Sequence, residues 1–89
     1  MIYKLQIEKT ARKWLEKQDS QTQDYIRSWI RRHLVGNESP RSQGKPLKGS
    51  KKGLWRYRAG DFRIIAKIYD SELLILVVEV GNRKDIYES

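Results

Sequence analysis

The fold of this chain is decided by residues 53–65, which read GLWRYRAGDFRII. The dipeptide Gly60-Asp61 lies between two runs in which apolar and basic residues alternate, a combination that is typical of a β-hairpin with a two-residue turn. The alternation predicts strands over residues 54–58 and 62–69. This hairpin is the point from which the rest of the fold can be inferred.

The predicted hairpin gathers arginines on one face of the sheet. A two-residue turn places Ala59 opposite Phe62 and Arg58 directly opposite Arg63. Arg56 lies two residues along from Arg58 and therefore points to the same face. Like charges that face each other across a sheet are destabilising. Because arginine binds phosphate with two parallel hydrogen bonds, we interpret the cluster as an anion-binding site.

A third strand is predicted over residues 73–80, whose apolar run LLILVV indicates a central strand that is covered on both faces. An antiparallel meander then places Arg63 beside Val80 or Val78, depending on one residue of loop length. In either register the end of this strand brings Arg83 to the same edge as the hairpin arginines.

The first half of the chain predicts one strand and two helices. Residues 2–7 alternate as a half-buried strand, and residues 9–17 show helical spacing. The pattern S-x-x-Q at Ser20 is a capping box, which starts a second helix that stops at Gly36. Residues 36–53 read as an extended, irregular basic loop. The order β-α-α-β-β-β predicts an α+β fold, with a helical hairpin packed on a mainly antiparallel four-stranded sheet.

Positive charge is concentrated in the middle of the chain. The 89 residues, enough for a single domain over 1–89, carry a net charge of +8, and residues 27–58 hold ten basic groups against Glu38 alone. Such a segment is typical of a nucleic-acid-binding surface. The candidate contacts are Arg31, Arg32, Lys45, Lys48, Lys51, Lys52 and Arg58. The competing interpretation is a solvated surface, with the hairpin arginines paired to Asp61 or Glu79.

Composition excludes several kinds of chemistry. The chain has no Cys and one His, which leaves no thiolate site, no Cys nucleophile and no His-rich metal site. We therefore expect no metal and no cofactor. The one histidine, His33, falls on the apolar stripe of the second helix and is expected to pack there. No apolar run reaches the ~18 residues of a membrane span, and no signal-peptide pattern is present, so we expect a cytoplasmic protein that does not bind membranes.

Three segments together resemble the RelE toxins of the RelE/ParE superfamily of toxin–antitoxin systems. Residues 53–65 are similar to the signature hairpin of that family. Pro46-Leu47-Lys48-Gly49 resembles the approach to the hairpin, and residues 79–87, which read EVGNRKDIY, resemble the closing segment. The predicted order of elements also fits, so the resemblance covers essentially the whole chain.

The resemblance implies a ribosome-dependent endoribonuclease that cuts mRNA without a metal, by attack of the 2′-OH on the scissile phosphate. Arg63 matches the arginine that grips this phosphate and Arg83 the second catalytic arginine. Tyr87 matches the tyrosine of proton transfer or base stacking, and Arg56 a common basic position. Leu54 departs from the family, because some members have Lys there. The implied partners are the ribosome, mRNA and an acidic, RelB-like antitoxin.

Two alternatives compete with this interpretation. A toxin of the ParE branch shares the fold but is directed at gyrase, and the presence of Arg63, Arg83 and Tyr87 together argues against it. The other alternative is a non-catalytic RNA-binding module that uses exposed rings, among them Trp14 and Trp29, as stacking platforms. Their helical spacing predicts that these two tryptophans belong to the core instead.

Overall fold

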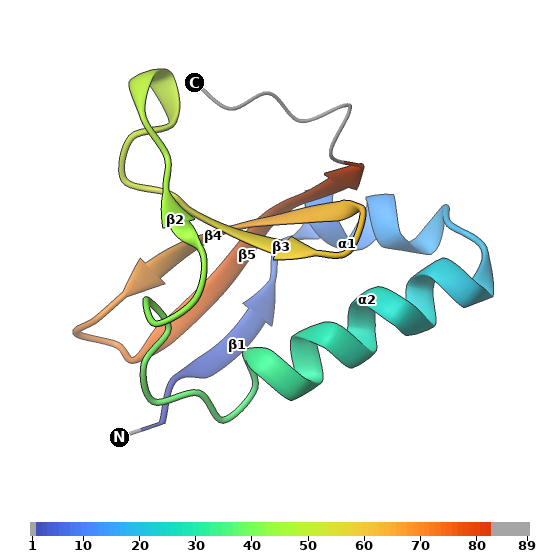
Figure 1. The fold of residues 1–89 in the computed structure, drawn as a ribbon. Coiled ribbons are helices and arrows are strands. Elements are labelled where there is room, and N and C mark those ends of the chain that lie inside the picture. The colour runs from blue at the N-terminus through green and yellow to red at the C-terminus, as the bar shows by residue number, and fades with distance from the viewer. Residues whose placement is uncertain (1, 83–89) are drawn as a thin grey trace.

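The computed structural model describes residues 2–82, which form two helices on one face of a five-stranded sheet (Figure 1). This confirms the predicted α+β class. In chain order the elements are β1 (Lys4–Ile7), α1 (Lys9–Glu16), α2 (Ser20–His33), β2 (Lys45–Pro46), the 3₁₀ turn η1 (Gly49–Lys51), β3 (Trp55–Ala59), β4 (Phe62–Tyr69) and β5 (Leu74–Asn82).

The sheet has the strand order β1-β5-β4-β3-β2, with β1 parallel to β5 and the other pairs antiparallel. The apolar strand β5 lies between two neighbours, as its sequence predicts. The prediction of four strands is wrong, because β2 adds a fifth at the edge beside β3. This strand has two residues, which is too short for alternation to show in the sequence. Its Pro46 has no N–H to donate, which an edge strand tolerates.

Local chemistry defines both ends of α2. Asp19 caps α2, since its carboxylate accepts a hydrogen bond of 2.7 Å from the backbone N–H of Thr22. The expectation that Ser20 provides the cap is wrong by one residue. Asp19 accepts from the N–H three residues ahead of it, which is the spacing expected for Ser20 and Gln23. Gly36 follows the helix with a φ of 75°, the left-handed conformation that favours glycine. Within residues 2–82 no helix is long and apolar enough to cross a bilayer.

The helix-facing side of the sheet holds the main core. Leu15 of α1 and Ile26 of α2 pack with Tyr57 and Ile64 of the hairpin, and all four are fully buried. The buried cluster comprises Ala11, Leu15, Ile26, Ile30, Leu34, Tyr57, Ala59, Ile64, Ala66, Ile75, Val77 and Val80. Alternate residues of the strands supply this core, so their neighbours in sequence point to the opposite face.

The opposite face has a second, small apolar cluster. Ile65 of β4 and Leu47, which follows β2, are buried there, with Leu54 and Val78 packed against them. Leu47 comes from residues 36–53, called the basic segment from here on, so this segment covers part of the sheet. The rest of that face carries the charged residues.

Residues 36–53 are more ordered than the sequence predicts. The expectation of an irregular loop is wrong, because this segment contains β2 and η1 and is tied to the sheet by side chains. The buried Tyr57 hydroxyl donates a hydrogen bond of 2.6 Å to the carbonyl of Pro40, and the indole N–H of Trp55 donates one of 2.6 Å to Gln43. Both hydrogen bonds join residues that are far apart in the chain, so local sequence patterns do not predict them.

Candidate nucleic-acid interface

Four basic residues form two neighbouring rows on the face of the sheet opposite the helices. In the first row, Lys45 of β2 lies opposite Arg56 of β3. In the second, Arg58 of β3 lies opposite Arg63 of β4, as the two-residue turn predicts. Side chains that face each other across a sheet lie about 5 Å apart at Cβ. Successive rows on one face are ~7 Å apart along the strands. The four cations are therefore spaced closely enough to share one or two phosphate groups.

The neighbour of Arg63 on β5 is Gly81, not Val80 or Val78 as the sequence predicts. A β-bulge causes the difference, because the register shifts by one residue between Ile65 and Ala66. Such a bulge inserts one extra residue into a strand without any marked signal in the sequence. Gly81 is buried and adds no side chain of its own to the row of Arg63.

Burial differs among these arginines. Arg56 and Arg63 are half-buried, whereas Arg58 is exposed. The Nε atom of Arg63 is buried, so part of its guanidinium is shielded from water. Partial burial strengthens the interaction of a guanidinium with a phosphate because less water screens it. Arg63 is thus the best placed of the described residues to hold an anion in a fixed position.

A carboxylate lies on the same face as the arginines. Glu79 of β5 is in register with Ile65 and, through it, with Arg56. Its Oε1 lies 3.4 Å from Nζ of Lys51 at the end of η1. The sequence predicts that Glu79 would pair with the arginines if they were merely solvated. In the structure Glu79 forms an ion pair with Lys51, which joins η1 to β5.

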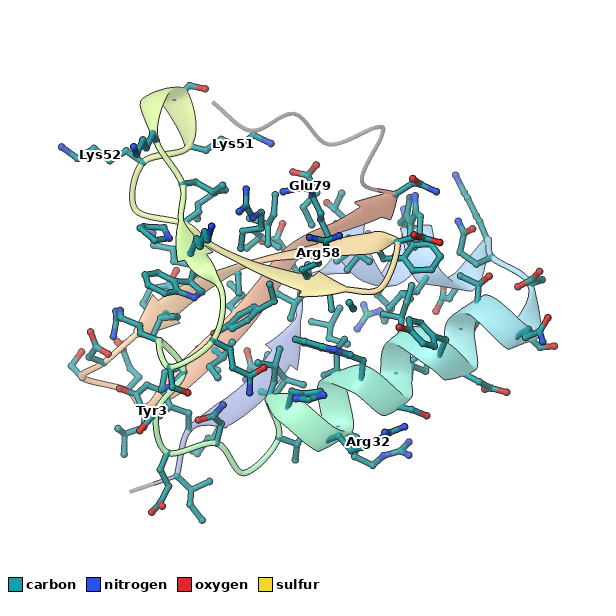
Figure 2. The ribbon with its side chains drawn as sticks, in the orientation of Figure 1. Tyr3, Arg32, Lys51, Lys52, Arg58 and Glu79 are labelled. Atoms are coloured by element: carbon teal, nitrogen blue, oxygen red, sulfur yellow. The ribbon has the colours of Figure 1, made fainter. Side chains whose placement is uncertain are left out.

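The predicted nucleic-acid contacts do not all fall on one surface. Figure 2 shows Lys51 and Lys52 on the turn beyond β2, and Arg32 at the opposite end of the molecule on α2. Arg31 and Arg32 are exposed on the last turn of that helix, where positive charge also complements the helix dipole. Two lysines are tied to the sheet face of the arginines: Lys45 lies opposite Arg56, and Lys51 contacts Glu79. Lys45, Lys48 and Lys52 are exposed and Lys51 is half-buried.

The sequence does not predict that Lys45 belongs to the arginine rows. It indicates Lys45 as a contact in an irregular loop, and the pairing of β2 with β3 turns it into the neighbour of Arg56. Gly44 makes this possible, because it has a φ of 80° and a Cβ on it would meet the carbonyl oxygen of Arg56. A glycine directly before Lys45 is the one signal that could have indicated the close approach.

The aromatic residues of the helices are core residues, as their spacing predicts. Trp14 and Trp29 are half-buried and pack against the main core, with ring centroids 6.2 Å from Phe62 and 6.0 Å from Tyr57, respectively. His33 stacks on Trp29 at 4.5 Å, in line with a packing role. These tryptophans are therefore poor candidates for stacking platforms. Within residues 2–82 no group of three His, Asp or Glu side chains could hold a metal ion.

Two of the four candidate catalytic residues, Arg83 and Tyr87, lie outside the described residues. For them the structure gives no position beyond the end of β5 at Asn82. The described part of the candidate site therefore consists of Arg56 and Arg63, with Lys45 and Arg58 beside them.

Comparisons with known proteins agree with this fold. A profile of the family described as ParE toxin of type II toxin–antitoxin system, parDE, matches residues 5–87. The match spans most of the chain, which places the protein in the class of type II toxin–antitoxin toxins. The chain belongs to this ParE toxin family, within the RelE/ParE superfamily. A comparison with curated protein sequences gives no match.

Solved structures of RelE toxins share the fold. The chain is similar to one from the RelBE2 toxin–antitoxin complex of Mycobacterium tuberculosis, with 24% identity and a TM-score of 0.83 over 93% of this chain and 100% of that one. It is similar to the isolated Escherichia coli RelE toxin, with 22% identity and a TM-score of 0.69 over 90% and 83%. A chain of the archaeal RelE–RelB complex from Pyrococcus horikoshii has 23% identity and a TM-score of 0.69 over 97% and 100%. At these identities the similarity shows the fold alone.

Proposed function

We propose that this chain is a toxin that cleaves mRNA on the ribosome as an endoribonuclease, with residues 1–89 forming one toxin domain that acts in the cytoplasm. The observation that carries the proposal is the pair of rows formed by Lys45, Arg56, Arg58 and Arg63. A sheet face that places Arg58 directly opposite Arg63, next to the pair of Lys45 and Arg56, concentrates positive charge where a phosphate group would bind.

The proposed chemistry needs cations more than it needs a strong base. The 2′-OH of the RNA gives up its proton and attacks the adjacent phosphorus to form a cyclic phosphate. The bond from phosphorus to the 5′ oxygen breaks, and that oxygen takes up a proton. The negative charge on the phosphate oxygens grows in the transition state. Arg63 stabilises this charge, together with Arg83. Preorganised charge of this kind typically contributes about 10²–10³-fold per donor. Arg56 and Tyr87 share the proton transfers, and no metal takes part.

The lysines of the basic segment, with Arg58, contact the RNA backbone around the cleavage site. Lys48 and Lys52 are exposed, and Lys51 is held against β5 by Glu79. Arg31 and Arg32 contact RNA on a separate side of the molecule. Backbone contacts release counterions, so binding to ribosomes should weaken steeply as salt rises.

A basic toxin needs a partner that neutralises it. Three of the similar structures are complexes of RelE-type toxins with their antitoxins. With a net charge of +8, this chain is suited to an acidic antitoxin of the same kind. We expect the antitoxin to wrap the helices and the basic sheet face.

The test compares two substitutions on β4 that remove the same charge from the same face. Arg63→Ala should reduce mRNA cleavage by about 10²–10³-fold, because it removes a transition-state contact. Lys67→Ala is the matched control, since Lys67 is exposed and lies four residues along the strand. Primer extension on translated mRNA after expression measures both. Undiminished cleavage by Arg63→Ala would contradict the proposal.

The second candidate function is a gyrase-directed toxin, which the description of the matched family favours. DNA supercoiling and mRNA integrity, followed in the same culture after expression, separate the two. Loss of negative supercoiling with intact mRNA would select the gyrase-directed function. Mapped mRNA cuts with normal supercoiling would select the endoribonuclease.

A further inference from the structure

A three-residue cluster joins the start of the basic segment to the far end of the sheet. The guanidinium of Arg41 donates two hydrogen bonds to the carboxylate of Asp70, of 2.8 and 3.0 Å. The hydroxyl of Tyr3 donates a third to the same carboxylate, at 2.8 Å. Asp70 lies in the turn between β4 and β5, and Tyr3 precedes β1, where Figure 2 labels it. The cluster thus connects three segments that are distant in sequence.

The contact of Arg41 with Asp70 is one of several that hold residues 40–44 to the rest of the protein. Next to Arg41, the carbonyl of Pro40 accepts the buried hydroxyl of Tyr57. Two residues on, the carbonyl of Gln43 accepts the indole N–H of Trp55. Lys45, the first residue after this stretch, enters the sheet opposite Arg56. The position of Lys45 in the cation rows therefore depends on how firmly this short stretch is held.

The charge of Arg41 is already used inside the protein. Both of its terminal nitrogens face the carboxylate of Asp70, a two-pronged geometry that is strong for its kind. The hydrogen bonds from Arg41, and then those from Tyr3, hold the pKa of Asp70 below its usual value. Sequence counts Arg41 among the ten basic groups of residues 27–58, yet its guanidinium is not directed at a ligand.

An exposed ion pair of this kind contributes little to global stability, because the side chains of Arg41 and Asp70 are 47% and 59% exposed. Its effect is local. Segments at a sheet edge open with much lower free energies than the whole protein, so a small contribution shifts their populations strongly. A two-residue strand such as β2 has few hydrogen bonds of its own to resist such opening.

We propose that Arg41, Asp70 and Tyr3 form a latch that holds residues 40–46 against β3 and thereby positions Lys45 and the following lysines for RNA. The three are positioning residues, and an acidic residue, Asp70, is required for binding an anionic ligand. The part that concerns RNA rests on the proposed function. The latch itself rests only on the contacts of these residues.

The decisive variant is Asp70→Asn, which keeps a turn residue of the same shape. It raises the net charge by one, so electrostatics alone predicts tighter binding to RNA. The latch predicts weaker binding by several-fold, because the lysines lose their fixed position. Asp24→Asn is the matched control, since Asp24 is an exposed aspartate of α2 and its removal makes the same charge change. Affinity for ribosomes and for a fluorescent RNA oligonucleotide, at one fixed salt concentration, measures both variants.

Arg41→Ala distinguishes a latch from a direct contact. If Arg41 acts through the latch, Arg41→Ala and Asp70→Asn weaken binding to a similar extent, and the double variant is no weaker than either one. If Arg41 contacts phosphate directly, Arg41→Ala weakens binding while Asp70→Asn strengthens it or leaves it unchanged. That second pattern would overturn the proposal.

Amide hydrogen exchange tests the latch without RNA. The amides of Gln43, Gly44, Lys45 and Leu47 should exchange several-fold faster in Asp70→Asn than in the wild-type chain or in Asp24→Asn. Unchanged exchange would overturn the latch, whatever the protein binds. Faster exchange in a chain that shows no affinity for ribosomes or RNA would instead contradict the proposed function and leave the latch in place.

Discussion

The two faces of the sheet are built from alternate residues of the same strands, yet they use them in opposite ways. On the helix-facing side, Tyr57 and Ile64 are cross-strand neighbours in a fully buried core. On the other side, the next pair along, Arg58 and Arg63, places two positive charges opposite each other. The first pair stabilises the fold by burial, whereas like charges that face each other across a sheet disfavour strand pairing. The comparison indicates that the same strands provide the core on one face and concentrate positive charge on the other.

The polar face also has a different kind of cover. Two helices cover the main core, whereas a single tied segment, with Leu47, covers Ile65 on the opposite side. The helical cover is held by many apolar contacts. The segment is held by a few hydrogen bonds and one apolar anchor, so it is the part of the molecule in which local substitutions should act on binding more than on stability.

The largest expected effect on stability concerns Ile64 and Ile65, two neighbouring residues of β4 that point to opposite faces of the sheet. Ile64→Ala should lower the free energy of unfolding by about 4 kcal/mol, because the cavity opens in the main core. Ile65→Ala should lower it by about 2 kcal/mol, since its small cluster can collapse around the gap. Urea denaturation measures both, and equal losses would mean that the two clusters are equally rigid.

A second prediction concerns the approach of the basic segment to β3. Gly44→Ala should destabilise the protein by about 2–3 kcal/mol, because φ is positive and the new Cβ meets the carbonyl of Arg56. Gly53→Ala is the control, since Gly53 also has a positive φ but no atom within 4 Å of the added Cβ, and should cost about 1 kcal/mol. Thermal denaturation compares them, and identical melting temperatures would contradict the predicted clash.

A third prediction concerns how much the buried hydroxyl of Tyr57, which donates a hydrogen bond to Pro40, contributes to stability. Tyr57→Phe should cost about 1 kcal/mol at neutral pH, because the hydrogen bond to Pro40 is lost. Burial raises the pKa of Tyr57 to about 12 in the folded state, from 10.0. The folded state thus favours the protonated hydroxyl. The contribution of this hydroxyl to the free energy of unfolding is fully present below pH 10 and is lost as the pH rises toward 12.

The measurement is the difference in unfolding free energy between the wild-type chain and Tyr57→Phe, followed from neutral to alkaline pH. This difference should shrink between pH 10 and 12, because only the wild-type chain carries the titrating hydroxyl. All other ionisable groups are common to the two proteins, so their contributions to the difference cancel. A difference that stays constant over this range would show that Tyr57 ionises equally in the folded and unfolded states.

The smallest expected effect tests the charge arrangement itself. Arg58→Gln should raise the free energy of unfolding by about 0.5 kcal/mol, since it removes the repulsion across the strands from Arg63. The same variant should bind RNA less tightly and reduce the salt slope by about one. A variant that loses both stability and affinity would mean that Arg58 stabilises the fold, and the sheet face would then not be strained for function.

Local sequence was sufficient for the hairpin and for the arginine pair. The alternation in residues 53–65 and the Gly60-Asp61 turn predict that Arg58 lies opposite Arg63, and the register confirms it. The core positions of Trp14 and Trp29 were predicted as well, from helical spacing. These predictions succeed because strand and helix periods, and the geometry of a two-residue turn, are properties of a few consecutive residues.

The neighbours of these residues were decided only by tertiary structure. A bulge in the β4–β5 ladder moved Gly81, in place of a valine, beside Arg63. The two-residue strand β2 put Lys45 opposite Arg56, and the carboxylate of Asp70 took Arg41 out of the basic surface. Each of these contacts joins distant segments, and the rest of the fold offsets the entropy lost when they come together. No short stretch of sequence can therefore encode such a contact. The sequence by itself determined that the arginines share a face, and the tertiary structure decided which of the other charges join them.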